Sequence, residues 1–199
     1  KNTLHILSNN TTKKKQMRRR NKITFSLFIV LVISACTSTE EQIIPLPILG
    51  ERDVDYKMVN GKEVADTLYH EVPDFEYINQ DSAWVKSSQL KNKVWVADFF
   101  FTHCPTICPP MTSQMKRLNE ETIDLASKVQ YLSFSIDPKR DTPMRLREYI
   151  GIHEIKAKNW HFMTGDEEAT HLLAKEFFNG AERDEEADGG FGHTDYFAL

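Results

Sequence analysis

One segment constrains the fold of this chain more than any other: residues 94–101, which read Val-Trp-Val-Ala-Asp-Phe-Phe-Phe. A strand with one face in water alternates apolar and polar residues, whereas a strand covered on both faces is apolar almost throughout. We therefore expect residues 94–101 to form a central strand with helices on both of its faces. The chain has 199 residues, 40% of them hydrophobic, which is enough to cover such a strand within one domain.

Helical and strand patterns alternate along the chain after this strand. Alternation of this kind predicts right-handed crossovers, a mostly parallel sheet and an α/β fold. In chain order, we expect a helix over residues 110–129, a strand over 131–136, a helix over 143–150, a strand over 160–163, a helix that begins after Thr164 or Asp166 and ends at Asn179-Gly180, and a strand over 196–199.

A β-hairpin is expected ahead of the main sheet. Two strand-like segments, Val54–Val59 and Glu63–Leu68, flank the dipeptide Asn60-Gly61. Asn-Gly supplies the positive φ angles that a type I′ turn needs. The sequence thus predicts a small antiparallel hairpin before the first strand of the α/β pattern.

The amino end has the features of a secretory signal. Met17 is followed by a basic stretch, an apolar run over residues 23–33 and the small residues Ser34-Ala35. The apolar run is about half of the roughly 20 residues that a membrane-spanning helix needs, so a permanent span is the weaker interpretation. Ile33-Ser34-Ala35-Cys36 looks like a bacterial lipobox, in which Cys36 would be lipidated. A plain signal peptide, or a retained anchor with an incidental Cys36, is the alternative.

These features divide the chain into four expected segments. Residues 1–16 contain no methionine and read as sequence upstream of the native protein, and residues 17–35 read as a lipoprotein signal peptide. Residues 36–50 would form a lipid-anchored tether. Residues 51–199 would form a domain on the extracytoplasmic side of a membrane in the bacterial cell envelope.

The charge distribution argues against nucleic acid as a partner. The first 35 residues hold eight of the 25 Lys and Arg residues and none of the 29 acidic residues. The remaining chain therefore has 17 basic against 29 acidic residues, a net charge of −12. Because affinity for a phosphate backbone comes mainly from Lys and Arg, a body this acidic is a poor nucleic-acid binder.

Cys104 and Cys108 lie where the strand over residues 94–101 gives way to the next helix, a position at which α/β sheets place functional sites. A helix amino end favours the thiolate, which is the form that binds metals and attacks disulfides. Three residues separate the two cysteines, one more than in thioredoxin redox helices, which leaves room to chelate one ion. The pair could instead be a structural disulfide or two inert core thiols, although Pro105 and Pro109 indicate a stiff, exposed loop.

Two thiolates and one imidazole suit copper, as Cu(I) or, with a further weak ligand, as Cu(II). Among seven histidines, His193 is the candidate ligand, because it follows the glycine-rich residues 189–192, which can move, and precedes the strand expected over 196–199. An exposed loop histidine is the alternative. His103 adjoins Cys104, but adjacent residues on extended backbone point to opposite faces. We therefore expect His103 at most to support a ligand, and not to bind the metal itself.

Three motifs resemble the SCO/SenC family of copper-delivery proteins of cytochrome c oxidase assembly. They are Phe100-Phe101-Thr102-His103-Cys104-Pro105-Thr106-Ile107-Cys108-Pro109, Ser135-Ile136-Asp137-Pro138-Lys139-Arg140-Asp141-Thr142-Pro143, and Gly192-His193-Thr194 before an aromatic strand. The resemblance covers about Pro45 to Leu199. It implies a thioredoxin-like three-layer sandwich with an inserted hairpin, tethered on the outer side of the membrane.

Carried over residue by residue, the resemblance implies that Cys104 and Cys108 bind one copper ion through sulfur and His193 binds it through imidazole. Asp137 and Asp141 would shape the site or the contact with a partner. The implied partner is subunit II of cytochrome c oxidase, or a similar cupredoxin-type acceptor. Its CuA centre would receive the copper by thiolate ligand exchange.

Two other functions stay open. In a thiol-disulfide oxidoreductase, Cys104 would attack and Cys108 would resolve, which would keep the cysteines of the acceptor reduced. In a copper or redox sensor, the same site would report its occupancy to another membrane protein.

The chain departs from the family pattern in two places. Ser82 stands in a turn where related folds often have glycine, and the family continues past residues 196–199 into a hairpin and a closing helix. The domain is therefore expected to be truncated at its carboxyl end.

Overall fold

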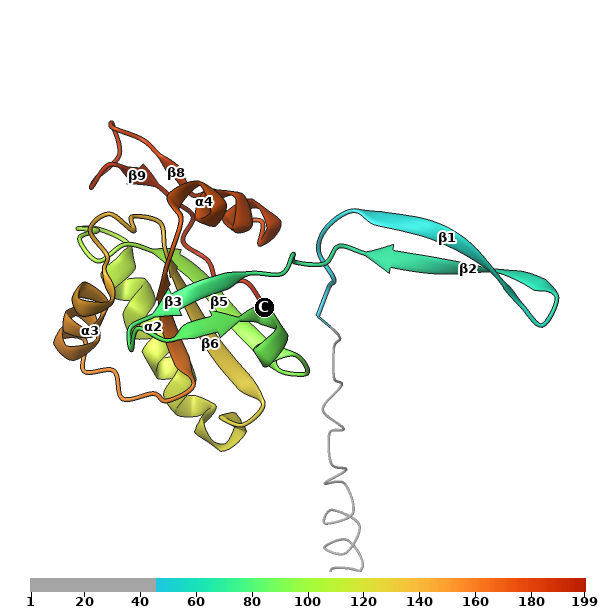
Figure 1. Cartoon of the computed structure of the whole chain (residues 1–199), viewed down its shortest axis with the longest axis horizontal. Coiled ribbons are helices and arrows are strands. Elements are labelled where there is room, and N and C mark those ends of the chain that lie inside the picture. Colours follow the sequence, from blue (N-terminus) through green and yellow to red (C-terminus); the bar gives the residue numbers. More distant parts are fainter. Residues whose placement is uncertain (1–45) are drawn as a thin grey trace, which may run out of the picture. The chain divides into compact units, whose positions relative to one another are not determined.

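The computed structural model describes residues 46–199 (Figure 1). The predicted signal peptide, Cys36 and most of the predicted tether lie outside the described residues. Within residues 46–199, none of the helices combines the length and the apolar character that a membrane span requires.

A five-stranded mixed sheet forms the centre of the fold, in the order β4-β3-β7-β6-β5. The strands are β3 (Glu76–Asn79), β4 (Trp84–Lys86), β5 (Val94–Phe100), β6 (Val129–Ser135) and β7 (Trp160–Thr164). β5 and β7 pair with β6 in parallel, whereas β3 pairs with β7 and with β4 in antiparallel fashion. The prediction of a mostly parallel sheet is wrong here, because β3 and β4, with four and three residues, are too short to give a strand pattern.

β5 is covered on both faces, as predicted, but it lies at the edge of the sheet and not in its middle. An apolar run reports that both faces are covered and carries no information about hydrogen-bonded neighbours. The prediction of a strand over residues 196–199 is also wrong. Ala198 forms only a single antiparallel bridge with Ala97, in which each residue donates to the other at 2.9 Å.

Helices cover both faces of the sheet, which gives the expected three-layer sandwich. They are α2 (Cys108–Glu121), α3 (Pro143–Ile152) and α4 (Glu167–Glu176), with short 3₁₀ turns η1 (Ser87–Leu90) and η2 (Ile123–Leu125). Neighbouring residues of a strand point to opposite faces. Phe100 contacts Tyr149 of α3 at 5.4 Å between ring centroids, and Phe99 contacts Phe177, just after α4, at 5.7 Å. The helix predicted over residues 110–129 is shorter than expected and ends at Glu121.

Two separate hairpins flank this sandwich in the sequence. β1 (Arg52–Val59) and β2 (Lys62–Tyr69) form the predicted amino-terminal hairpin, with φ angles of 51° at Asn60 and 75° at Gly61. The other hairpin, β8 (Glu182–Arg183) and β9 (Phe191–Gly192), is not among the predicted elements. It directly precedes His193.

Candidate metal centre

The loop between β5 and α2 carries the first two candidate ligands. β5 ends at Phe100 and α2 begins at Cys108, with prolines in its first turn, where a missing backbone N–H costs nothing. Cys104 lies within this loop, and the amide of Cys108 donates to its sulfur at 3.5 Å. The start of the helix therefore places both sulfurs side by side.

The two thiols differ in their surroundings. Burial raises the pKa of Cys104, but hydrogen bonds from the backbone at Cys108 and Thr106 outweigh it, and the pKa is lowered overall. Cys108 is only 1% exposed, and burial raises its pKa well above the ordinary value. Both cysteines are free thiols. Cys104 is thus the thiol that ionises more readily.

His193 faces both sulfurs. Its Nε2 lies 3.4 Å from Sγ of Cys108 and 3.9 Å from Sγ of Cys104. Its Nδ1 lies 3.1 Å from the carbonyl oxygen of Thr194. Because a carbonyl oxygen can only accept, Nδ1 carries the proton and Nε2 presents its lone pair to the sulfurs. Burial lowers the pKa of His193, which favours this neutral form.

The two sulfurs and the imidazole nitrogen lie within 4.8 Å of one another. Two soft sulfur donors and one imidazole fit Cu(I), and they also fit Cu(II) when a further weak ligand is added. His193 lies 89 residues after Cys104 and 85 residues after Cys108, so the fold, and not the local sequence, brings the imidazole to the two sulfurs.

Asp141 ties the cysteine loop to the neighbouring strand. It is fully buried and accepts hydrogen bonds from the amide of Thr102 at 3.0 Å and from the hydroxyls of Thr102 and Ser135 at 2.6 Å each. Thr102 lies in the loop and Ser135 ends β6. The N-cap of α3 is the next residue, Thr142, which accepts from the amide of Arg145 at 3.3 Å.

Replacing Asp141 with asparagine is expected to destabilise the fold by about 2 kcal/mol, because three donors would lose a charged acceptor. Urea denaturation of the reduced, metal-free protein measures this change. Asp124→Asn, at an exposed position of η2, is the control for the loss of one acidic group. Equal stability of the two variants would mean that the buried carboxylate contributes nothing to the loop.

Asp137 and His103 lie beside the same loop. Asp137 is 2% exposed, and its carboxylate accepts from Arg140 at 3.1 Å and lies 3.7 Å from Nδ1 of His103. Nε2 of His103 lies 2.5 Å from Nη1 of Arg140 and 3.3 Å from the carbonyl oxygen of Gly189. His103 thus joins the cysteine loop to the segment that carries His193.

The sequence interpretation missed Asp98, a buried acid in β5. It is 2% exposed and lies opposite Ser133 of β6, and its Oδ1 has no hydrogen-bond partner among the described residues. Burial raises its pKa to about 7, although hydrogen bonds with Ser133 and with its own backbone oppose the shift. One acidic residue inside an otherwise apolar strand was the available signal.

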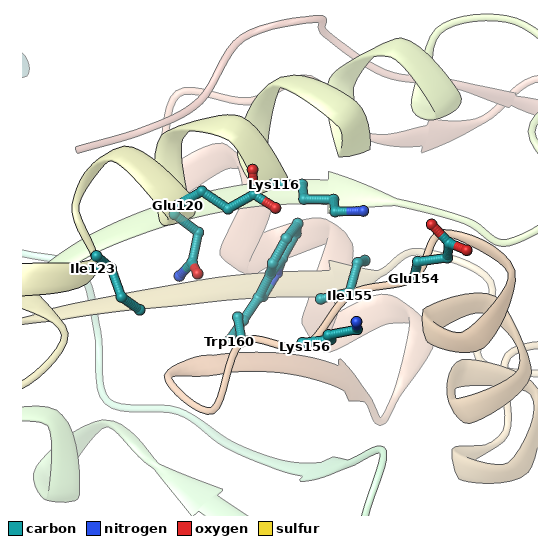
Figure 2. Close-up of a pocket in the computed structure, with 9 residues that line it drawn as sticks. Lys116, Glu120, Ile123, Glu154, Ile155, Lys156 and Trp160 are labelled. Atoms are coloured by element: carbon teal, nitrogen blue, oxygen red, sulfur yellow. The ribbon is translucent and has the colours of Figure 1, made fainter.

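A cavity of about 330 Å³ lies elsewhere, at the carboxyl-terminal half of α2 and the start of β7 (Figure 2). Its lining residues are Lys116, Asn119, Glu120, Ile123, Glu154, Ile155, Lys156, Ala157 and Trp160. The sulfur–imidazole cluster is at the opposite end of α2. The candidate metal centre therefore does not use this cavity.

Comparison with known proteins gives a consistent result. Residues 64–199 match the SCO1/SenC protein family. The SCO1 protein homolog of Bacillus subtilis (strain 168) is 43% identical over 109 residues, which are 53% of this chain and 54% of that protein. The chain thus spans about half the length of this relative.

Solved structures show the same similarity. A SCO1/SenC family lipoprotein from Bacillus anthracis str. Ames is 36% identical, with a TM-score of 0.59 over 64% of this chain and 76% of that one. BsSco, in which a disulfide switch was identified, is a member of the Sco family of cytochrome c oxidase assembly proteins. It is 38% identical, with a TM-score of 0.51 over 55% of this chain and 64% of that one. Copper-bound ScoI of Arabidopsis thaliana is 25% identical (TM-score 0.51, 61% and 75%). The expected thioredoxin-like fold is confirmed.

Proposed function

The chain belongs to the SCO1/SenC family, and we propose that it binds one copper ion through Cys104, Cys108 and His193 and delivers it to an acceptor of cytochrome c oxidase assembly. The observation that carries the proposal is the set of two free thiols and one neutral imidazole within 4.8 Å. The copper-bound state of ScoI from Arabidopsis thaliana supports the choice of metal.

The proposed delivery is a ligand exchange. An incoming thiolate of the acceptor forms a bond to copper while the bond between copper and one protein sulfur breaks, so the valence of the ion does not change. Cys104 is the better first leaving ligand, because it lies in the loop and its thiolate is stabilised by backbone amides, whereas Cys108 is more deeply buried. Cys108 and His193 hold the ion until a second acceptor ligand arrives.

We propose the CuA centre of oxidase subunit II, or a similar cupredoxin-type site, as the acceptor. The similarity to BsSco, a member of a family of oxidase assembly proteins, supports this assignment. Asp141, Asp137 and His103 would keep the cysteine loop in place during transfer, since their contacts join that loop to β6 and to the segment before His193.

We further propose that a lipid on Cys36 anchors the protein to a membrane of the bacterial envelope, with the domain on the extracytoplasmic side. The signal pattern over residues 17–35 and the similarity to a SCO1/SenC lipoprotein support this location. Mass spectrometry of the amino-terminal peptide is expected to find a lipid-modified Cys36. An unmodified peptide from membrane-extracted protein would contradict the anchor.

A thiol-disulfide reductase is the second candidate function, favoured by the lowered pKa of Cys104 and by its neighbour Cys108. The Cys104 thiolate would attack an acceptor disulfide and form a mixed disulfide. Cys108 would then attack Cys104, which releases the acceptor as a dithiol and leaves the chain oxidised.

Mixing the copper-loaded chain with the reduced, metal-free CuA domain of subunit II tests the proposal. We expect copper to move to the acceptor in a one-to-one ratio with the chain, measured as metal content after the two proteins are separated. Cys104→Ser is expected to abolish transfer, and Cys36→Ser, which keeps both site cysteines, is the control.

The same pair of proteins distinguishes the second function. The metal-free chain is mixed with the oxidised acceptor, and the free thiols of both are counted by alkylation and mass spectrometry. If the chain binds no copper, and if its two thiols are oxidised while the acceptor disulfide is reduced, the protein is a reductase and the delivery proposal is wrong. Copper uptake without release would also contradict delivery.

A further inference from the structure

The position of His193 depends on packing at a distance from the cysteines. Both sulfurs are held by one loop and one helix end, but His193 follows the β8–β9 hairpin. Its two strands have two residues each, with the register Glu182 opposite Gly192 and Arg183 opposite Phe191. A hairpin this short is not stable by itself in water. The contacts that dock it on the sandwich therefore decide where the imidazole lies.

Phe101 is an apolar side chain that packs against this segment. It is fully buried and directly follows β5. Its ring centroid lies 5.2 Å from that of Phe191 and 5.6 Å from that of His193, and the latter pair meets edge to face at 79°. The same ring lies 4.8 Å from His103. Phe101 thus touches β9, the imidazole and the cysteine loop together.

Gly189, in the turn of the hairpin, lies close to the Phe101 ring. A Cβ at this position would lie 2.6 Å from Cε2 and 3.0 Å from Cζ of Phe101, and 3.4 Å from Cδ of Pro105. Contacts between a Cβ and a ring carbon at 2.6 Å do not occur without a shift. The Gly189 carbonyl oxygen also lies 3.3 Å from Nε2 of His103. Only glycine allows the turn to approach this closely.

We propose that Gly189 and Phe101 are positioning residues for copper binding: their contact seats the β8–β9 hairpin and so holds the His193 imidazole opposite the two sulfurs. The inference rests on the proposed copper function for its effect on affinity, but the seating itself is a property of the metal-free protein. A turn that stood farther from Phe101 would carry Phe191 and His193 outward with it, while Cys104 and Cys108 would keep their places.

Two adjacent glycines give a matched pair of variants. Gly189 and Gly190 have φ angles of 82° and 85°, so alanine is strained to a similar degree at both. A Cβ on Gly190, however, would meet no atom within 4 Å. Gly189→Ala therefore tests the contact with Phe101, and Gly190→Ala controls for the strain of the backbone.

We expect Gly189→Ala to weaken Cu(I) binding 10- to 100-fold, the range seen when groups that orient metal ligands are lost. We expect the nitrogen coupling of the imidazole in the electron paramagnetic resonance spectrum of the Cu(II) form to be lost or reduced. Gly190→Ala should leave both properties near those of the wild type.

A measurement without metal separates this inference from the copper proposal. In the nuclear magnetic resonance spectrum of the reduced, metal-free protein, we expect contacts between the Phe101 and His193 rings in the wild type and in Gly190→Ala, but not in Gly189→Ala. Circular dichroism checks that each variant is folded. Equal spectra and equal affinities for the two alanine variants would overturn the seating. Absence of copper binding by the wild type would overturn only the proposed function.

Discussion

The variant His193→Ala is expected to bind copper at least 100-fold more weakly than the wild type. Loss of groups that only orient metal ligands costs 10- to 100-fold in affinity, and the loss of a ligand should cost more. The remaining two sulfurs make an incomplete coordination shell for the ion. A Cu(I) titration of the reduced protein against a competing chelator measures the affinity.

His153→Ala is the matched control for this prediction. His153 is also partly buried, but it directly follows α3, where its ring centroid lies 4.3 Å from that of Tyr149. It is expected to bind copper as the wild type does. Unchanged affinity in His193→Ala would exclude the three-ligand centre and leave a site made by the two cysteines alone.

The substitution Asp98→Asn is expected to remove a pH dependence of the free energy of unfolding. In the wild type, this dependence amounts to about 4 kcal/mol between pH 4 and pH 8. The pKa of Asp98 is about 7 in the folded protein, against 3.8 for an ordinary aspartate. The folded state therefore holds a proton that the unfolded state has already lost. This proton stabilises the fold fully below about pH 4, and its contribution is lost as the pH rises to 7.

Asparagine has nearly the same shape and no charge at any pH, so it removes this dependence. The free energy of unfolding of Asp98→Asn, relative to that of the wild type, should rise with pH across this range and level off above 7. Urea denaturation of the metal-free, reduced proteins at several pH values measures the difference. Asp124→Asn is the control at an exposed position. Parallel curves for Asp98→Asn and the wild type would mean that Asp98 is ionised in the folded protein at pH 5.

Much of the fold was predictable because its long elements carry strong periodic patterns. The apolar run of β5, the Asn60-Gly61 turn and the helix that begins at Cys108 each gave a clear local signal. The edge position of β5 was not predictable. The burial of the two faces of a strand is visible in its sequence pattern, but the strands that pair with it are not. The short β3 and β4 lacked the length for any pattern.

The residues of the candidate centre were predictable from the sequence, but the packing that positions them was not. The spacing of Cys104 and Cys108 and the glycines before His193 identified three candidates. The seating of His193 on Phe101 could not be read from the sequence, because Phe101 looks like one more apolar residue after β5. Its contacts with Gly189 and Phe191 join positions about 90 residues apart, which no local pattern records.

The separation of the ligands along the chain has a consequence for the lifetime of the protein. An ion held by both Cys108 and His193 cross-links two points 85 residues apart. Because only the folded chain brings these two ligands together, binding of the ion favours the folded state. Under the proposed function, the copper-loaded protein would therefore be the more resistant to proteases, and release of the ion would loosen the segment that carries His193. Proteolysis in the cell would then degrade the copper-free protein faster than the copper-loaded protein, so that the cellular level of the protein would rise and fall with the copper supply.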